Sequence, residues 1–138
     1  MRPKLPAMAL DWGTKRIGIA VSDALGITVR GIPTLERKTP REDYDALIGL
    51  IREVRAETVI VGDPRRADGR ASGSSRKAAR FAFQLGRHAG LNVQMWDEQL
   101  TTWEARQTLR GRLAAPGDVD RMAAVILLES YLEATKAA

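Results

Sequence analysis

The hydrophobic pattern of this chain changes its period once, and that change constrains the fold more than any other feature. The first apolar residues form three short runs rich in branched side chains, over Ala7–Trp12, Arg16–Ser22 and Ile27–Ile32. Tight breaks separate these runs, which predicts an antiparallel meander of three strands. From Asp43 onward, apolar residues at helical spacing alternate with short apolar runs, which is typical of alternating helices and strands.

This alternation defines the rest of the expected architecture. We predict helices over Asp43–Val54, Lys77–His88, Thr101–Leu109 and Asp118–Ala134, strands over Thr58–Val61 and Asn92–Trp96, and a polar loop over Asp63–Ser75. A meander followed by such units implies an α/β fold, with a mixed five-stranded sheet and helices on both faces. With 138 residues, the chain fits one domain covering residues 1–138.

Composition excludes several classes of chemistry. The sequence has no cysteine, which rules out disulfides, thiolate zinc sites and cysteine nucleophiles and suits a reducing cytoplasm. Its longest apolar run is Met122–Leu128, far short of the roughly 18 residues that a membrane span requires. We therefore expect a soluble cytoplasmic protein with no membrane partner.

Carboxylates stand at the ends of the predicted elements. Asp11 ends the first strand, Glu98 follows the last strand, and Asp118 and Asp120 open the last helix. Ligands of open α/β sheets collect at the carboxyl ends of the strands, so Asp11 and Glu98 would converge if their strands were neighbours. One acid of the last helix could join them while the other caps that helix.

Such a group of acids favours a particular chemistry. Oxygen ligands without histidine or cysteine suit Mg²⁺ or Mn²⁺, and paired ions of this kind hydrolyse phosphodiesters. The single histidine, His88, is predicted on a helix away from these acids, which disfavours a histidine mechanism. The alternatives are structural: Asp11 as a turn residue and Glu98 as an ordinary exposed side chain.

The basic residues are concentrated in one segment. Asp63–Arg87 holds seven basic and two acidic residues and so carries the whole net charge of +5. Such clustering is typical of a phosphate-binding surface, although a solvated basic loop is the alternative. A tight turn beside Asp11 adds a hydroxyl and two cations. The candidate nucleic-acid contacts are Thr14, Lys15, Arg16, Arg65, Arg66, Arg70, Arg76 and Lys77.

Four blocks of the sequence carry a resemblance to a known family. The block from Ala9 to Asp23 resembles the N-terminal signature of the YqgF/RuvX family of nucleases similar to Holliday junction resolvases. Further blocks agree in the family's order: Val59–Gly62 with Pro64 and Asp68-Gly69, Asp97-Glu98 with Leu100–Thr102 and Glu104-Ala105, and Val119-Asp120 with Ala123-Ala124.

The resemblance implies a ribonuclease H-like fold and a site. Asp11, Glu98 and Asp120 match the family's catalytic acids, which are expected to hold Mg²⁺ or Mn²⁺, and this match selects Asp120 over Asp118. The implied activities are cleavage of branched DNA and processing of the 5′ end of pre-16S rRNA. Three residues depart from the family pattern, Trp12, Arg66 and Gln99, and they bear on substrate contacts more than on the acids.

Two other functions remain open at this point. Asp11–Thr14 also resembles the first phosphate motif of actin-like and sugar-kinase-like ATP-binding proteins, although a chain of this size has little room for their second domain. A basic nucleic-acid-binding module without catalysis is the other alternative. Paired cuts in a four-way junction would call for a homodimer with twofold symmetry.

Overall fold

The computed structural model describes residues 3–63, 73–97 and 116–136. The sequence-predicted helix Thr101–Leu109 lies outside these residues, as do Glu98, Arg65, Arg66 and Arg70. The elements are β1 (Ala7–Trp12), β2 (Arg16–Ser22), β3 (Val29–Glu36), α1 (Pro40–Val54), β4 (Thr58–Asp63), α2 (Gly73–Ala89), β5 (Val93–Asp97) and α4 (Pro116–Lys136).

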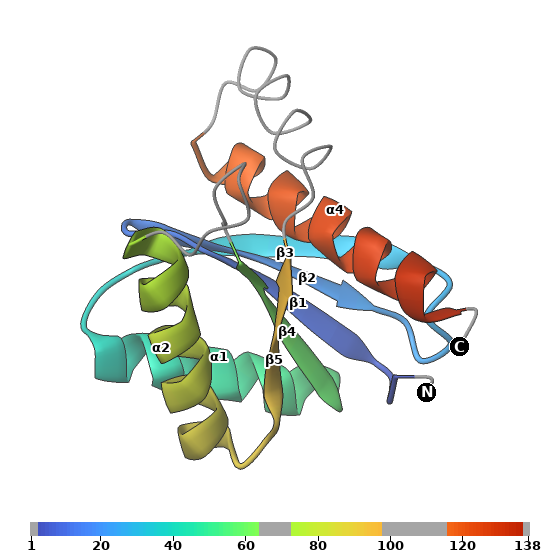
Figure 1. The fold of residues 1–138 in the computed structure, drawn as a ribbon, viewed down its shortest axis with the longest axis horizontal. Coiled ribbons are helices and arrows are strands. Elements are labelled where there is room, and N and C mark those ends of the chain that lie inside the picture. The colour runs from blue at the N-terminus through green and yellow to red at the C-terminus, as the bar shows by residue number, and fades with distance from the viewer. Residues whose placement is uncertain (1–2, 64–72, 98–115, 137–138) are drawn as a thin grey trace.

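The five strands form one mixed sheet in the order β3-β2-β1-β4-β5. The β1–β2 and β2–β3 pairs are antiparallel, as the predicted meander requires, and the β1–β4 and β4–β5 pairs are parallel. Helices α1 and α2 cover one face and α4 crosses the other (Figure 1). The predicted mixed sheet with helices on both faces is confirmed.

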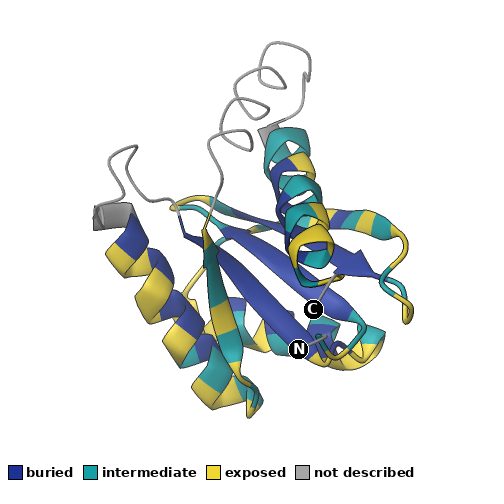
Figure 2. Ribbon diagram, turned by 45° about the vertical axis from the view of Figure 1, so that its right-hand side comes forward, coloured by how far each residue is buried: buried dark blue, intermediate teal, exposed yellow. Residues whose placement is uncertain are grey.

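In β1 and β2, the two faces of the sheet carry side chains of different size. Large residues such as Met8, Leu10 and Ile19 point toward α1 and α2, where they join the larger core. The strand positions that alternate with them are small, as at Ala9 and Ala20, and they point toward α4. Figure 2 shows the central strands buried between the two helical layers.

Glycines let α4 approach the sheet closely. A β-carbon on Gly18 of β2 would overlap the backbone carbonyl of Asp120, and one on Gly31 of β3 would overlap the side chain of Arg121. The first turns of α4 therefore rest directly on the backbone of the sheet. This contact fixes the height at which the beginning of the last helix lies above β2.

The third strand is displaced from its predicted position. We expected it over Ile27–Ile32, but it runs over Val29–Glu36. The carboxylate of Asp23 accepts hydrogen bonds from the backbone N–H groups of Ile27 (2.7 Å) and Thr28, which places both in the preceding turn. The strand continues through Pro33 because β3 is an edge strand, where a missing N–H is tolerated.

Other predicted boundaries also move by a few residues. Helix α1 begins at Pro40 because the hydroxyl of Thr39 accepts a hydrogen bond from the backbone N–H of Glu42 and caps the helix. Strand β4 extends to Asp63, and α2 begins at Gly73 within the predicted polar loop.

The close approach at Gly18 yields a stability prediction. Gly18→Ala should lower the free energy of unfolding by about 1–3 kcal/mol, because the new methyl group overlaps the backbone of α4, which can move only if the helix shifts away from the sheet. The measurement is urea unfolding followed by circular dichroism.

Gly49 in α1 provides the matched control. A β-carbon there would meet nothing within 4 Å, so Gly49→Ala should raise the free energy of unfolding by about 0.5–1 kcal/mol. Equal stability of the Gly18 variant and the unmodified protein would contradict the proposed contact.

Candidate metal and nucleic-acid site

Asp11 is a buried acid near the carboxyl end of β1. Its relative exposure is 6% although it directly follows a fully buried apolar run. Since Leu10 lies in the core under α1 and α2, alternation along the strand puts Asp11 on the opposite face, toward α4. A carboxylate on this face among small residues is unusual for a strand, which supports a functional role.

The register of the sheet brings Asp11 near the beginning of α4. Asp11 pairs with Gly18 across the β1–β2 ladder, and Gly18 in turn lies against the backbone of Asp120. Gly18 is thus the shared neighbour of the two acids. The structure places these parts of the chain together although more than 100 positions separate them in the sequence.

A hydrogen bond from β3 fixes the beginning of α4. The hydroxyl of Thr34 donates to the backbone carbonyl of Gly117 over 2.6 Å. The bond joins the edge strand to the residue just before the two acids of the helix. It therefore positions the acid-bearing turn of α4 along the sheet, as Gly18 sets its height.

Asp118 and Asp120 differ in their surroundings. The guanidinium of Arg121 donates to the carboxylate of Asp118 over 2.7 Å, and both side chains are partly exposed. Asp118 therefore forms a local ion pair in the first turn, whereas the backbone of Asp120 lies on Gly18. The choice of Asp120 over Asp118 as a ligand stays a prediction.

Strand order modifies the expected meeting of Asp11 and Glu98. Strands β1 and β5 are not neighbours, because β4 lies between them. Their backbones are therefore two strand spacings apart, roughly 10 Å. Glu98 lies outside the described residues, so its approach to Asp11 stays a prediction. Within residues 3–63, 73–97 and 116–136, no group of three or more metal-ligating side chains is found.

Asp97, the neighbouring acid that could take the place of Glu98, lies on the face of the sheet away from Asp11. Val93 and Met95 pack under α1 and α2, whereas Trp96 packs under α4. Continued alternation puts the exposed Asp97 on the side of α1 and α2.

Asp63 is a buried acid that sequence reasoning assigned to a loop. It ends β4, its relative exposure is 4%, and its carboxylate accepts a hydrogen bond from the hydroxyl of Ser75. Because Ser75 lies in the first turn of α2, this contact ties the beginning of that helix to the sheet. The signal was present in the sequence, since Asp63 follows a buried apolar run just as Asp11 does.

The turn between β1 and β2 is held by Arg37, which sequence reasoning also missed. Its guanidinium donates to the carbonyl of Gly13 and to the carboxylate of Asp43, both over 3.2 Å. The same group lies 5.0 Å from the centre of the Trp12 ring. Arg37 therefore links the turn beside Asp11 to the beginning of α1 and stabilises its position.

The candidate phosphate contacts fall into two groups. Thr14 and Lys15 are exposed in the braced turn, while Arg16 forms an ion pair with Glu36 over 3.2 Å. Arg76 and Lys77 are exposed in the first turns of α2. The remaining three candidates, Arg65, Arg66 and Arg70, lie outside the described residues.

One cavity lies at the other end of the molecule. It has a volume of about 530 Å³ and is lined by residues of the β2–β3 turn, such as Leu25 and Ile27, and of the last turns of α4, such as Leu132. Asp11 and Asp120 lie at the opposite ends of β1 and α4. The cavity is therefore separate from the acids.

No helix among the described residues is long and apolar enough to cross a membrane.

The sheet order, together with a helix crossing its β1–β3 side, defines a protein with a ribonuclease H-like fold. Solved resolvases share this arrangement. "T. thermophilus RuvC in complex with Holliday junction substrate" aligns with a TM-score of 0.59 and 16% identity, covering 94% of this chain and 95% of that one. A fowlpox virus resolvase solved with Holliday junction DNA aligns with a TM-score of 0.55 and 12% identity, covering 94% and 98%.

The chain belongs to the RuvX family, whose model, described as "Holliday junction resolvase", matches residues 6–134. This confirms the resemblance seen in the motifs. A relative from Koribacter versatilis, named "Putative pre-16S rRNA nuclease", is 45% identical over 91% of this chain and 85% of its own. A relative of the same name from Syntrophus aciditrophicus is 40% identical over 92% of this chain and 87% of its own.

The Thr34 bond yields a prediction on the beginning of α4. Thr34→Val should lower the free energy of unfolding by about 0.5–1.5 kcal/mol and speed hydrogen exchange of amides in the early turns of α4, because the helix loses its link to β3. Hydrogen exchange read by mass spectrometry or NMR tests this.

Thr135→Val is the matched control at the other end of α4, where the threonine hydroxyl bonds to the carbonyl of Tyr131 within the same helix. It should leave exchange in the early turns of α4 unchanged. Equal exchange there in the Thr34 variant and the unmodified protein would rule out the anchoring role.

Proposed function

We propose that this chain is a divalent-metal-dependent nuclease that hydrolyses phosphodiester bonds in branched DNA, structured RNA such as the 5′ end of pre-16S rRNA, or both. The observation that carries the proposal is the meeting of Asp11 and the Asp120 turn around Gly18 in a chain of the RuvX family. An RNA substrate is supported by relatives described as putative pre-16S rRNA nucleases, and junction DNA is supported by a structural neighbour solved with a Holliday junction.

The proposed metal ligands are Asp11, Glu98 and Asp120. The donor set fits Mg²⁺ or Mn²⁺, since it consists of carboxylate oxygens and one of them belongs to a buried acid on the sheet. Bound ions would make an attacking water more acidic and neutralise charge on the reacting phosphate.

The protein's own contribution is positioning. Asp11 is held by a central strand that is paired on both sides, so its carboxylate has little freedom to shift. Thr34 and Gly18 fix the turn that carries Asp120. Lys15 and the arginine-rich segment after Asp63 would hold the phosphate backbone against these acids.

The first functional prediction concerns Asp11. Asp11→Asn should abolish strand cutting in Mg²⁺ or Mn²⁺ while leaving affinity for the substrate nearly unchanged, because the amide keeps the shape but loses the charge. Gel analysis of labelled four-way junction and precursor RNA under identical ionic conditions measures cutting, and fluorescence anisotropy measures binding. Persistent cutting by a clean preparation would show that Asp11 is not a ligand.

The second prediction separates the two acids of α4. Asp120→Asn should lower the cutting rate by at least about 100-fold, the scale of one lost charged group in a catalytic site. Asp118→Asn should change it only a few-fold, because a partly exposed ion pair with Arg121 contributes about 0–1 kcal/mol. The reverse order of effects would reassign the ligand to Asp118.

A further inference from the structure

One face of α2 presents an unusual row of exposed side chains. Arg76, Arg80, Phe83 and Arg87 follow one another at spacings of four, three and four residues, which places them along one side of the helix. We call these four residues the α2 row. All four are exposed, whereas Ala78, Phe81, Ala82 and Leu85 of the same helix are buried in the core.

The α2 row lies in a segment of the sequence that carries no acidic side chain. The sequence from Gly69 to Trp96 contains no Asp or Glu. Within the part of the chain that the structure describes, none of the three arginines of the row forms an ion pair. Their guanidinium groups are therefore available to an anionic partner, in contrast to Arg37 and Arg121, which are paired within the protein.

Phe83 distinguishes the row from an ordinary basic face. Its relative exposure is 63%, and the guanidinium of Arg87 lies 5.9 Å from its ring centre. The helix does not require this ring for packing, because Phe81 already fills the core and contacts the rings of Trp12 and Tyr44. An exposed ring flanked by arginines is the combination that binds bases and phosphates of unpaired nucleic acid.

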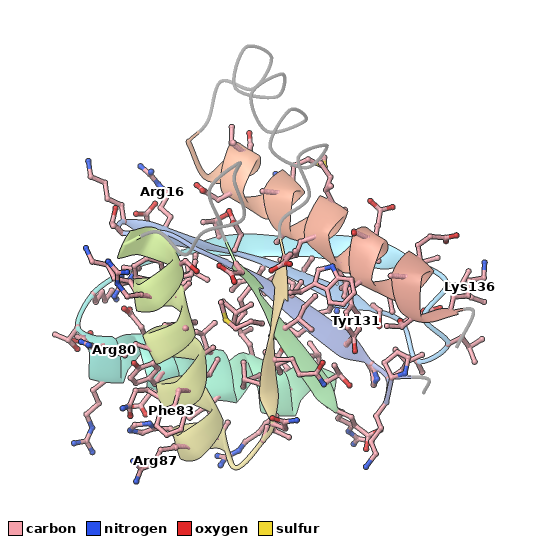
Figure 3. All side chains as sticks on the ribbon, viewed as in Figure 1. Arg16, Arg80, Phe83, Arg87, Tyr131 and Lys136 are labelled. Carbon is pink, nitrogen blue, oxygen red and sulfur yellow. The ribbon has the colours of Figure 1, made fainter. Side chains whose placement is uncertain are left out.

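The position of the row suits a nuclease. Helix α2 begins beside the end of β4, where Ser75 bonds to Asp63, and the row runs away from that end of the sheet. From Arg76 to Arg87 it extends roughly 16 Å, at about 1.5 Å for each residue, which is enough for several phosphates of one strand. Figure 3 shows Arg80, Phe83 and Arg87 along α2, with Arg16 beyond the beginning of the helix in this view.

We propose that the α2 row extends the nucleic-acid-binding surface of the basic segment and holds an unpaired strand of the substrate. The arginines bind successive phosphates, and Phe83 stacks on a base. The inference rests on the proposed nuclease function and adds to it a preference for substrates with an unpaired segment next to the site of cutting.

The test measures binding to the full chain in EDTA, so that no substrate is cut. The probes are a fluorescently labelled unpaired oligonucleotide and a blunt duplex of the same length, each titrated by anisotropy across a series of salt concentrations. Arg80→Ala/Arg87→Ala should weaken binding of the unpaired probe and reduce the slope of log affinity against log salt by about 1.4, or 0.7 for each lost phosphate contact.

Phe83→Leu tests stacking separately from charge, because leucine keeps an apolar side chain and removes the ring. It should weaken binding of the unpaired probe by roughly 5-fold or more and change binding of the duplex by less than 2-fold, because only unpaired bases expose their faces to a stacking ring. Equal losses for both probes, or no loss, would overturn the stacking role.

A matched control removes the same charge from another helix. Arg41 and Arg52 are exposed on α1 and, like Arg80 and Arg87, form no ion pair within the described residues. Arg41→Ala/Arg52→Ala should leave the salt slope for the unpaired probe within error of the unmodified protein. If Arg80→Ala/Arg87→Ala behaves like this control, the α2 row is not a binding surface.

The result is independent of the cutting assay. Absence of metal-dependent cutting by the unmodified protein would overturn the proposed nuclease and leave the binding data interpretable. Conversely, if cutting depends on Asp11 but the α2 variants bind the unpaired probe like the unmodified protein, the nuclease is supported and only this inference is overturned. Unchanged thermal unfolding of the variants shows that lost binding does not reflect lost folding.

Discussion

The contact between Gly18 and the beginning of α4 is the constraint on which the site depends. The last helix can carry an acid to the end of the first strand only if it lies close to the sheet, and a side chain at position 18 would hold it away. The small residues on the same face, such as Ala9 and Ala20, extend this close approach along the helix. Packing and function thus impose the same requirement on this face.

The opposite face follows a different rule. Large side chains such as Leu10 and Ile19 fill the space beneath α1 and α2, so stability there comes from apolar burial rather than from close backbone contact. Asp63 is the polar exception, and its bond to Ser75 ties α2 to the end of β4. The sheet therefore separates two tasks: one face orients the acids, and the other supports the helix that carries exposed arginines.

Much of this arrangement could be predicted from the sequence. The bounds of β1 and β2 follow directly from their apolar runs, and the change of period predicts the mixed sheet. The third strand was misplaced because its apolar run over Ile27–Ile32 stops before Pro33, whereas an edge strand tolerates proline and continues to Glu36. The order of the strands could not be predicted from local sequence patterns, because only tertiary pairing determines that β4 lies between β1 and β5.

The site shows the same division between local signal and tertiary context. An acid after an apolar run singled out Asp11, whose role as a ligand stays a prediction, but the same signal at Asp63 was absorbed into a loop because the glycine before it suggested a turn. Residues that act by bracing, such as Arg37 and Thr34, have no sequence signature, since their partners lie 24 and 83 positions away. The candidate acids can thus be proposed from local pattern, while the residues that position their segments emerge only when the chain is folded.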